Sequence, residues 1–377
     1  MPKILFTAST YSHLVQFHRP YLAAFRQMGW TVEAACGGAP MEIPEAHHVV
    51  HIPFEKDMLS PRNGAACLAL RRLIRSRGYD LISCHTALAS YFTRMAVLGI
   101  KRRPRVACTV HGYLFGEENP AAKGRLLSAA ERMTAPVTDL LMTMNRWDTQ
   151  YAQAHRLGRT VVEVPGMGVD VRRLGQAPAG AGAALRETWG IGDEDVLLVY
   201  AAEFSGRKNQ ETLIRAVTRL PEQVKLALPG QGALWEECRA LARRLGVGDR
   251  VLFPGQVQMA PWYSAADLAV SSSRSEGLPF NIMEAMAWGL PVVASRVKGH
   301  TDLLEASGAG LLYPYGDWAA CAEQIRALLR DPGRARQMGE QGRQAVQAYA
   351  LERVQPIILA QYETLMPLRQ PAAAGSV

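Results

Sequence analysis

The sequence lacks the features that mark several special classes of protein. Its six cysteines include no Cys-x-x-Cys pair, which argues against a zinc ribbon or disulfide scaffold and favours a reducing, cytoplasmic setting. No apolar run approaches the roughly 18–20 residues of a membrane span, and the first residues do not resemble a signal peptide. With 377 residues, 48% of them hydrophobic, the chain is too long for one ordinary core and too apolar to be disordered.

Common catalytic motifs are missing as well. The sequence contains neither a Gly-x-x-x-x-Gly-Lys-Ser/Thr phosphate loop nor a Gly-x-Ser-x-Gly nucleophile turn. Gly180 and Gly182 follow no predicted strand, so they do not make a dinucleotide-binding loop. The acidic run 193–195 precedes a predicted strand and is interpreted as a solvated turn. The nine histidines show no close metal-ligand spacing, so no metal site is expected.

Acidic residues are scarce in the first half of the chain. Residues 1–167 hold 20 Lys and Arg against 12 Asp and Glu, a surplus of +8, whereas residues 168–377 hold 22 of each. This surplus fits an anionic lipid, nucleic acid or phosphorylated partner, or simply a solvated helix surface. Its two clusters are Arg71, Arg72, Arg75 and Arg77, and then Lys101, Arg102, Arg103 and Arg105.

Short apolar runs alternate with amphipathic segments, which predicts an α/β protein with parallel sheets. Strands are expected at 3–8, 31–36, 49–52, 81–85, 106–111, 140–144, 160–164, 196–202, 224–228, 251–253, 268–272, 292–295 and 310–313. Helices are expected at 17–28, 62–77, 87–99, 121–134, 146–157, 209–219, 233–245, 259–266, 280–288, 301–306, 317–330, 333–349 and 351–366.

This alternation predicts two doubly wound domains, 1–167 and 168–350. The Gly/Ala/Pro-rich stretch 175–182, near the start of the second domain, is interpreted as a surface loop. A helix beginning at 351 is expected to pack back on the first domain and to end in a frayed tail. Ligands of such folds bind at the carboxyl ends of the strands, so loops that follow strands are the candidate sites.

The most informative segment runs from Glu276 to Glu284, Glu-Gly-Leu-Pro-Phe-Asn-Ile-Met-Glu. It follows a predicted strand and enters a helix near Phe280. Gly277, Leu278 and Pro279 form the turn, and the amides near Phe280 and Asn281, with the helix dipole, favour an anion such as a diphosphate. Carboxylates there suit the vicinal hydroxyls of a sugar or ribose. The alternative is two exposed glutamates beside a helix start.

This string resembles the Glu-x7-Glu motif of the retaining family 4 glycosyltransferases, whose GT-B fold places two Rossmann-like domains across a cleft. Segments at 164–170, 228–232 and 251–257 follow in the family's order. The resemblance implies that Glu276 binds the donor sugar and Glu284 the ribose. It also implies that the turns at Gly230 and at Gly255 to Val257 bind the nucleotide.

The family's phosphate-binding pair is an arginine and a lysine. Lys208 matches the lysine, whereas Glu203 stands where the arginine is expected, so Lys208 would act alone or with Arg207. His111 matches the family's histidine near the donor sugar, which makes Glu276, Lys208 and His111 the predicted catalytic group. Ser12, His13, His18 and His85 also follow strands and are weaker candidates for acceptor binding; a buried structural role is the alternative.

The resemblance implies a cytoplasmic enzyme that needs no metal or other cofactor. It would transfer a hexose or N-acetylhexosamine, with retention, from a UDP-sugar to a saccharide acceptor. The basic first half favours a lipid-diphosphate-linked acceptor at an anionic membrane surface, as in exopolysaccharide or capsule synthesis. The alternatives are a UDP-sugar epimerase or phosphorylase on the same fold. A basic nucleic-acid-binding protein is a further alternative, but no recognisable nucleic-acid-binding module is present.

Overall fold

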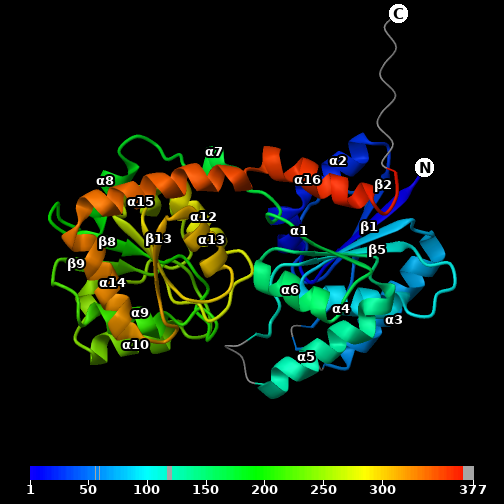
Figure 1. Ribbon diagram of the computed structural model, residues 1–377, viewed down its shortest axis with the longest axis horizontal. Helices are drawn as coiled ribbons and strands as arrows, with labels where there is room; N and C mark the ends of the chain where they lie inside the picture. Colours follow the sequence, from blue (N-terminus) through cyan, green and yellow to red (C-terminus); the bar gives the residue numbers. More distant parts are fainter. Residues whose placement is uncertain (56, 59, 117–120, 368–377) are drawn as a thin grey trace, which may run out of the picture. The chain divides into compact units, whose positions relative to one another are not determined.

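The computed structural model describes residues 1–55, 57, 58, 60–116 and 121–367. The chain divides into two compact units. Unit 1 comprises Met1–Gly168 together with the chain from Leu351 onward, and unit 2 comprises Val169–Ala350. Unit 1 is therefore built from both ends of the chain, with unit 2 inserted between them (Figure 1). Most of the tail that the sequence predicts to be frayed lies outside the described residues.

Unit 1 contains a seven-stranded, all-parallel sheet in the order β3-β2-β1-β4-β5-β6-β7. Its inner strands are continuous apolar runs because helices cover both faces (Figure 1). The strands are β1 (Lys3–Ala8), β2 (Thr31–Cys36), β3 (His48–His51), β4 (Leu81–His85), β5 (Arg105–Val110), β6 (Leu140–Thr143) and β7 (Thr160–Glu163).

The first helical segment of unit 1 differs from the expectation. Instead of one helix over 17–28, two helices meet at His18, and the first begins at Tyr11 because the Thr10 side chain caps it. The helices are α1 (Tyr11–Phe17), α2 (Arg19–Gln27), α3 (Arg62–Arg77), α4 (Ala87–Val97), α5 (Ala121–Thr134), α6 (Arg146–Ala154) and α16 (Leu351–Glu363), with the short 3-10 helix η1 (Ala135–Val137).

Helix α16 completes unit 1 although it is last in the sequence. Gln355 donates a hydrogen bond to the carbonyl of Pro20 beside α2, at 2.8 Å. Tyr362 is fully buried, and its hydroxyl lies 2.6 Å from that of Ser83 on β4. The aromatic ring of Tyr362 also packs edge-on against Phe25, with 5.3 Å between ring centroids.

Unit 2 contains a six-stranded, all-parallel sheet in the order β10-β9-β8-β11-β12-β13. Its strands are β8 (Val196–Val199), β9 (Val224–Ala227), β10 (Val251–Leu252), β11 (Leu268–Ser271), β12 (Val292–Ser295) and β13 (Gly310–Tyr313). Its helices are α7 (Val171–Leu174), α8 (Ala181–Thr188), α9 (Gln210–Val217), α10 (Trp235–Arg244), α11 (Met259–Ala265), α12 (Phe280–Ala287), α13 (His300–Ser307), α14 (Trp318–Arg330), α15 (Pro332–Ala345), η2 (Gly248–Arg250) and η3 (Val346–Tyr349).

Helix α8 corrects the interpretation of 175–182 as a loop, because the helix already begins at Ala181. Gly182 is needed there for close packing: a Cβ atom at this position would lie 2.8 Å from the carbonyl oxygen of Ser264 on α11. A glycine in that stretch therefore indicates helix contact rather than a flexible connection.

Each sheet reverses its direction of strand addition once. In unit 1 the reversal lies between β1 and β4, and in unit 2 it lies between β8 and β11. At such a point the loops after two adjacent strands lead to opposite faces of the sheet and open a crevice at its carboxyl edge. The sequence-predicted residues can therefore be examined at two defined places, one in each unit.

Candidate functional site

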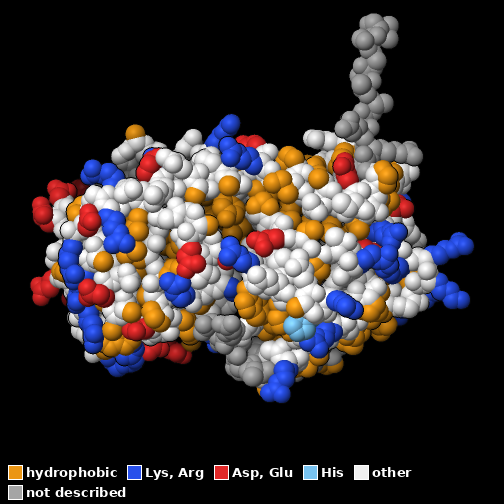
Figure 2. Space-filling model, viewed as in Figure 1, with side chains coloured by type: hydrophobic (Ala, Val, Ile, Leu, Met, Phe, Trp, Pro, Cys, Tyr) orange, Lys and Arg blue, Asp and Glu red, His pale blue; other side chains and the backbone are white. Residues whose placement is uncertain are grey.

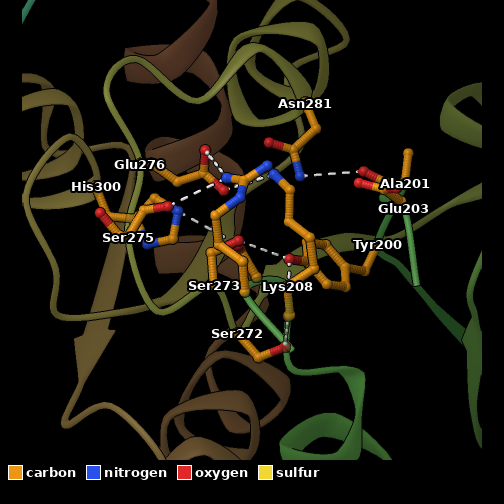
Figure 3. Close-up of polar contacts among 12 residues, drawn as sticks. Tyr200, Ala201, Glu203, Lys208, Ser272, Ser273, Ser275, Glu276, Asn281 and His300 are labelled. Atoms are coloured by element: carbon orange, nitrogen blue, oxygen red, sulfur yellow. Dashed lines mark hydrogen bonds and ion pairs between the residues drawn. The ribbon is translucent and has the colours of Figure 1, made fainter. Parts of the chain in front are cut away.

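Lys208 and Glu276 meet at the reversal point of unit 2. Lys208 follows β8, Glu276 follows β11, and these two strands are neighbours. The Lys208 Nζ atom lies 2.5 Å from Glu276 Oε1, and an Arg207 guanidinium nitrogen lies 3.1 Å from Glu276 Oε2 (Figure 3). Glu276 is only 8% exposed and the Lys208 side chain 13%, so their ion pair lies largely out of water, whereas the Arg207 side chain is 40% exposed.

The charges of this group do not cancel. Burial alone would raise the pKa of Glu276, but the charges of Lys208 and Arg207 outweigh it and lower the pKa to about 2. Burial lowers the pKa of Lys208, and the nearby Glu276 carboxylate opposes that effect. Lys208, Arg207 and Glu276 together carry one net positive charge that an anionic ligand can use, and the Glu203 carboxylate acts on Lys208 as a weaker opposing charge.

The main chain of Lys208 is fixed to the end of β11 by side chains that the sequence analysis did not select. The Lys208 carbonyl accepts hydrogen bonds from the Tyr200 hydroxyl at 3.1 Å and from the Ser272 hydroxyl at 2.9 Å. The Tyr200 hydroxyl also lies 2.8 Å from that of Ser273 (Figure 3). These contacts position Lys208 before any ligand binds.

His300 is a second residue that the sequence analysis missed. It is fully buried beside Glu276, and its Nδ1 atom lies 2.8 Å from the Ser295 carbonyl oxygen. Burial lowers its pKa to about 4, so the ring is neutral at pH 7. Gly299, with φ +81°, brings this turn so close that a Cβ atom would lie 2.7 Å from the Gly277 carbonyl. His300 could have been selected from the sequence by its position alone, because the turn that holds it directly follows β12.

The predicted turn and helix start lie directly after Glu276. Gly277 and Pro279 are buried, Leu278 is half-buried, and α12 begins at Phe280. The Asn281 side-chain amide donates to the carbonyl of Ala201 at 3.3 Å, which links the helix start to the chain after β8 (Figure 3).

Glu284 lies one turn inside α12, and its environment differs from that of Glu276. Its Oε2 atom accepts a hydrogen bond from the Tyr263 hydroxyl at 2.9 Å. Burial raises the pKa of Glu284, and the hydrogen bond from Tyr263 opposes this effect. A phenol on one oxygen holds the carboxylate in place and leaves its other oxygen able to accept from a ligand hydroxyl.

The turns at Gly230 and at Gly255 to Val257, which are predicted to bind the nucleotide, lie along the same edge of the sheet. The Gly230 N–H donates to the Gly255 carbonyl at 2.8 Å, and a Cβ atom on Gly230 would lie 2.0 Å from the Ala202 carbonyl oxygen. Only glycine fits there. Val257 is exposed at the end of its loop, and Glu203, which replaces the expected arginine, is exposed as well.

The histidines of the sequence analysis gather at the reversal point of unit 1. His13 lies on α1 and His18 at the α1–α2 junction, while His85 ends β4 and His111 follows β5. The His18 and His85 rings stack with 3.7 Å between centroids, and the Nε2 atoms of His13 and His111 lie 3.3 Å apart. Ser12 donates to the Thr10 hydroxyl at 3.1 Å.

Burial keeps these rings uncharged. It lowers the pKa of His13 to about 4 and lowers the pKa of His18, His85 and His111 as well, with the neighbouring histidines adding to the effect in the last three. His85 is further fixed by the Ser83 hydroxyl, 2.8 Å from its Nε2 atom.

Two family models match the chain. One, described as Glycosyltransferase Family 4, matches residues 21–173, and the other, Glycosyl transferases group 1, matches residues 183–345. EpsD of Bacillus subtilis (strain 168), which is named as a glycosyltransferase, is 33% identical over 90% of this chain and 91% of its own length. The chain belongs to the family 4 glycosyltransferases. The expected enzyme class is therefore confirmed.

Further relatives of this glycosyltransferase differ in their donors. A GDP-mannose-dependent alpha-(1-6)-phosphatidylinositol monomannoside mannosyltransferase of Mycolicibacterium smegmatis is 30% identical over 72% of this chain and 74% of its own length. The structure of Anabaena HepE in complex with UDP-glucose matches with a TM-score of 0.76 at 22% identity, covering 97% of this chain and all of that one. The expected GT-B class, with two parallel-sheet Rossmann-like domains, is confirmed.

The matches support neither an epimerase or phosphorylase nor a nucleic-acid-binding protein. The roles assigned to individual residues of this glycosyltransferase, including the contact of His111 with a donor sugar, stay predictions. Among the described helices, none combines the length and the apolar character that crossing a bilayer requires.

Proposed function

We propose that this glycosyltransferase transfers a hexose or N-acetylhexosamine, with retention, from a UDP-sugar bound to unit 2 onto a saccharide acceptor. One observation carries the proposal: Lys208 and Arg207 share the single carboxylate of Glu276 at the strand-order reversal of unit 2. The surplus positive charge lies where ligands of open parallel sheets bind, and a diphosphate complements it.

Each residue of the site has a task that follows from its surroundings. Lys208 stabilises the charge that develops on the leaving diphosphate, with the first amides of α12 aiding it. Glu284, whose carboxylate is oriented by Tyr263, accepts hydrogen bonds from the ribose hydroxyls. Glu276 stays ionised because of its low pKa and accepts from a hydroxyl of the donor sugar.

The proposed reaction is balanced without a protein nucleophile. The bond between the sugar C1 atom and the β-phosphate oxygen breaks, and the diphosphate leaves with the electron pair. The acceptor hydroxyl attacks C1 from the same face, and its proton passes to the leaving phosphate oxygen. The free-energy barrier arises because charges separate as an oxocarbenium-like sugar forms. Fixed charges in the site lower this barrier.

Two measurements test this function. UDP-sugars should raise the melting temperature more than GDP- and ADP-sugars, and UDP should be released only when an acceptor is present. Glu276→Ala and Glu284→Ala should each lower turnover at least tenfold, about 1.4 kcal/mol of transition-state binding, while circular dichroism remains unchanged. Near-normal turnover in both variants contradicts the site, and UDP-sugar interconversion without acceptor contradicts transfer.

The acceptor is proposed to be lipid-diphosphate-linked, in cell-surface polysaccharide assembly at an anionic membrane. On the face seen in Figure 2, unit 1 carries mostly basic side chains, whereas acidic and basic ones mix over unit 2. Fewer members of the basic clusters are available to contact a membrane than the sequence suggests, because four of them have partners within the protein. Arg71 donates to the carbonyls of Ala96 and Leu98, Arg77 pairs with Glu33, and Arg103 and Arg105 pair with Asp139.

Among the described residues, the exposed cluster members whose side chains have no ion-pair or hydrogen-bond partner are Arg72, Arg75, Lys101 and Arg102. Arg72→Glu/Arg75→Glu should therefore weaken sedimentation with phosphatidylglycerol vesicles, since each cation near such a surface contributes about 1 kcal/mol. Arg334→Glu/Arg336→Glu on α15 is the matched control, with the same change of charge on exposed residues of unit 2. Wild-type protein that stays in the supernatant at low salt would favour a soluble acceptor.

A further inference from the structure

Three of the clustered histidines bring their ring nitrogens together. One nitrogen from each of His13, His18 and His111 lies within 4.8 Å of the other two. The three residues come from α1, the α1–α2 junction and the end of β5, so they are separated in sequence by up to 98 positions. No Asp, Glu or Cys belongs to this group among the described residues.

The burial of His18 is not explained by a purely structural role, because its hydrogen-bonding atoms are unsatisfied. Its side chain is 0% exposed, and neither of its ring nitrogens has a hydrogen-bond partner among the described residues. A buried polar atom without a partner destabilises the fold, and His18 has two such atoms. A ligand that accepts or shares an imidazole lone pair would remove part of this cost.

We propose that His13, His18 and His111 bind one divalent transition-metal ion of the Zn²⁺ class. Imidazole nitrogen is a preferred ligand of Zn²⁺, Co²⁺, Ni²⁺ and Cu²⁺, whereas Ca²⁺ and Mg²⁺ require oxygen ligands that this group lacks. All three ligands belong to unit 1, and the proposal does not rest on the proposed function; an ion held by His111 would take the place of the donor-sugar contact predicted for that ring.

The distances fit an ion after a small closure of the site. Zn–N bonds of about 2.0–2.1 Å in tetrahedral geometry place two ligand nitrogens roughly 3.3 Å apart. The Nε2 atoms of His13 and His111 are already 3.3 Å apart. Ion binding replaces the shared proton between them, so both rings then carry their proton on Nδ1. The His18 ring, at the junction of two helices, has to move toward the other two.

His85 belongs to the wall of the site rather than to the ligands. Its Nε2 atom is engaged by the Ser83 hydroxyl, and its ring stacks on that of His18. Three protein ligands leave a fourth position for water or for a substrate oxygen, the arrangement of exchangeable rather than closed zinc sites. This site could not be predicted from the sequence, because the ligands are not closely spaced along the chain.

The test is metal binding to the full chain, stripped first with a chelator. Titration with Zn²⁺ alone, followed by calorimetry, should show about one ion per chain, and Co²⁺ should give the visible absorption of a nitrogen-ligated, low-coordinate site. His13→Ala and His111→Ala should each weaken binding by about a hundredfold or more, since losing even outer-sphere partners of a metal costs 10–100-fold. His48→Ala, an exposed histidine on β3, is the matched control.

His13 and His111 are chosen for substitution because they are less completely buried than His18. Circular dichroism checks that each variant is folded. One equivalent of Zn²⁺ in wild type and His48→Ala, with weakened binding in both other variants, supports the site. It is overturned if wild type binds no stoichiometric ion. It is equally overturned if the folded His13→Ala and His111→Ala variants bind as wild type does, or if His48→Ala abolishes binding.

Discussion

Both units place polar side chains at the carboxyl edge of a parallel sheet. The units differ in how these side chains avoid the energetic cost of burial. Unit 1 gathers four imidazoles that burial holds neutral. Unit 2 gathers a lysine, an arginine and a glutamate that remain charged because they pair. Neutrality avoids the desolvation penalty of a charge, whereas pairing offsets it.

The difference indicates what each edge can bind. Neutral imidazoles offer lone pairs and N–H groups, which suit sugar hydroxyls or a soft cation. A paired cluster with a surplus cation suits a diphosphate, because an incoming anion replaces the carboxylate as partner of Lys208. One fold thus supplies two chemically distinct surfaces through the residues that follow β1, β4 and β5 in one unit and β8 and β11 in the other.

The largest effect is expected from acid acting on His300, the buried neutral histidine of unit 2. Its pKa of about 4 in the folded protein lies below 6.5, so the unfolded chain takes up the proton first as pH falls. Stability is therefore lost between pH 6.5 and 4, by roughly 2 kcal/mol on going from pH 6.5 to pH 5. Urea unfolding of wild type and His300→Gln at both pH values measures this loss.

The loss must be measured in both wild type and His300→Gln, because other groups titrate in both proteins. His300→Gln should lose about 2 kcal/mol less than wild type over that interval. Equal losses would show that burial does not hold His300 neutral beside the paired cluster.

A second effect separates the two cations of the paired cluster. Lys208 is 13% exposed and lies 2.5 Å from Glu276, whereas Arg207 is 40% exposed and lies 3.1 Å away. Lys208→Ala should lower turnover about tenfold and Arg207→Ala about threefold, because charge in a drier place interacts more strongly. Steady-state kinetics with a saturating donor decides the order; a worse Arg207 variant would mean that Arg207 binds the phosphates.

The smallest effect concerns Glu284, the carboxylate whose described partner is a phenol rather than a cation. Tyr263→Phe removes one hydrogen bond worth about 0.5–1.5 kcal/mol, so KM for the donor should rise about threefold with kcat nearly unchanged. Tyr200→Phe is the informative comparison, because that hydroxyl fixes the Lys208 carbonyl and should affect kcat. A Tyr263→Phe change confined to kcat would contradict ribose binding by Glu284.

The inner strands could be predicted because they are buried on both faces and form continuous apolar runs. Helix α1 could not be predicted as easily, since it contains a β-branched valine and two aromatic residues; Thr10 was the overlooked N-cap. Helix α8 was hidden by Gly182, which serves close packing against Ser264. The residues around a glycine do not reveal whether that glycine lies in a loop or at a close contact between helices.

The donor residues could be found by motif, but their partners could not. Tyr200, Tyr263 and His300 act through contacts that depend on β8, β11 and β12 being adjacent. Strand order is not encoded in any single segment. The same holds for the histidines: each could be placed after a strand, but their convergence requires β1, β4 and β5 to be neighbours.

The position of α16 has a consequence for how the protein is made. Unit 1 needs this helix to cover Phe25 and to partner the Ser83 hydroxyl through Tyr362. At roughly 5–20 residues per second, a ribosome spends roughly 10–40 s on the inserted unit 2 before it reaches Leu351. During that interval the nascent first half exposes an apolar strip that only the last helix can cover. Unit 2, whose sheet is contiguous in sequence, can finish folding first although its synthesis begins second.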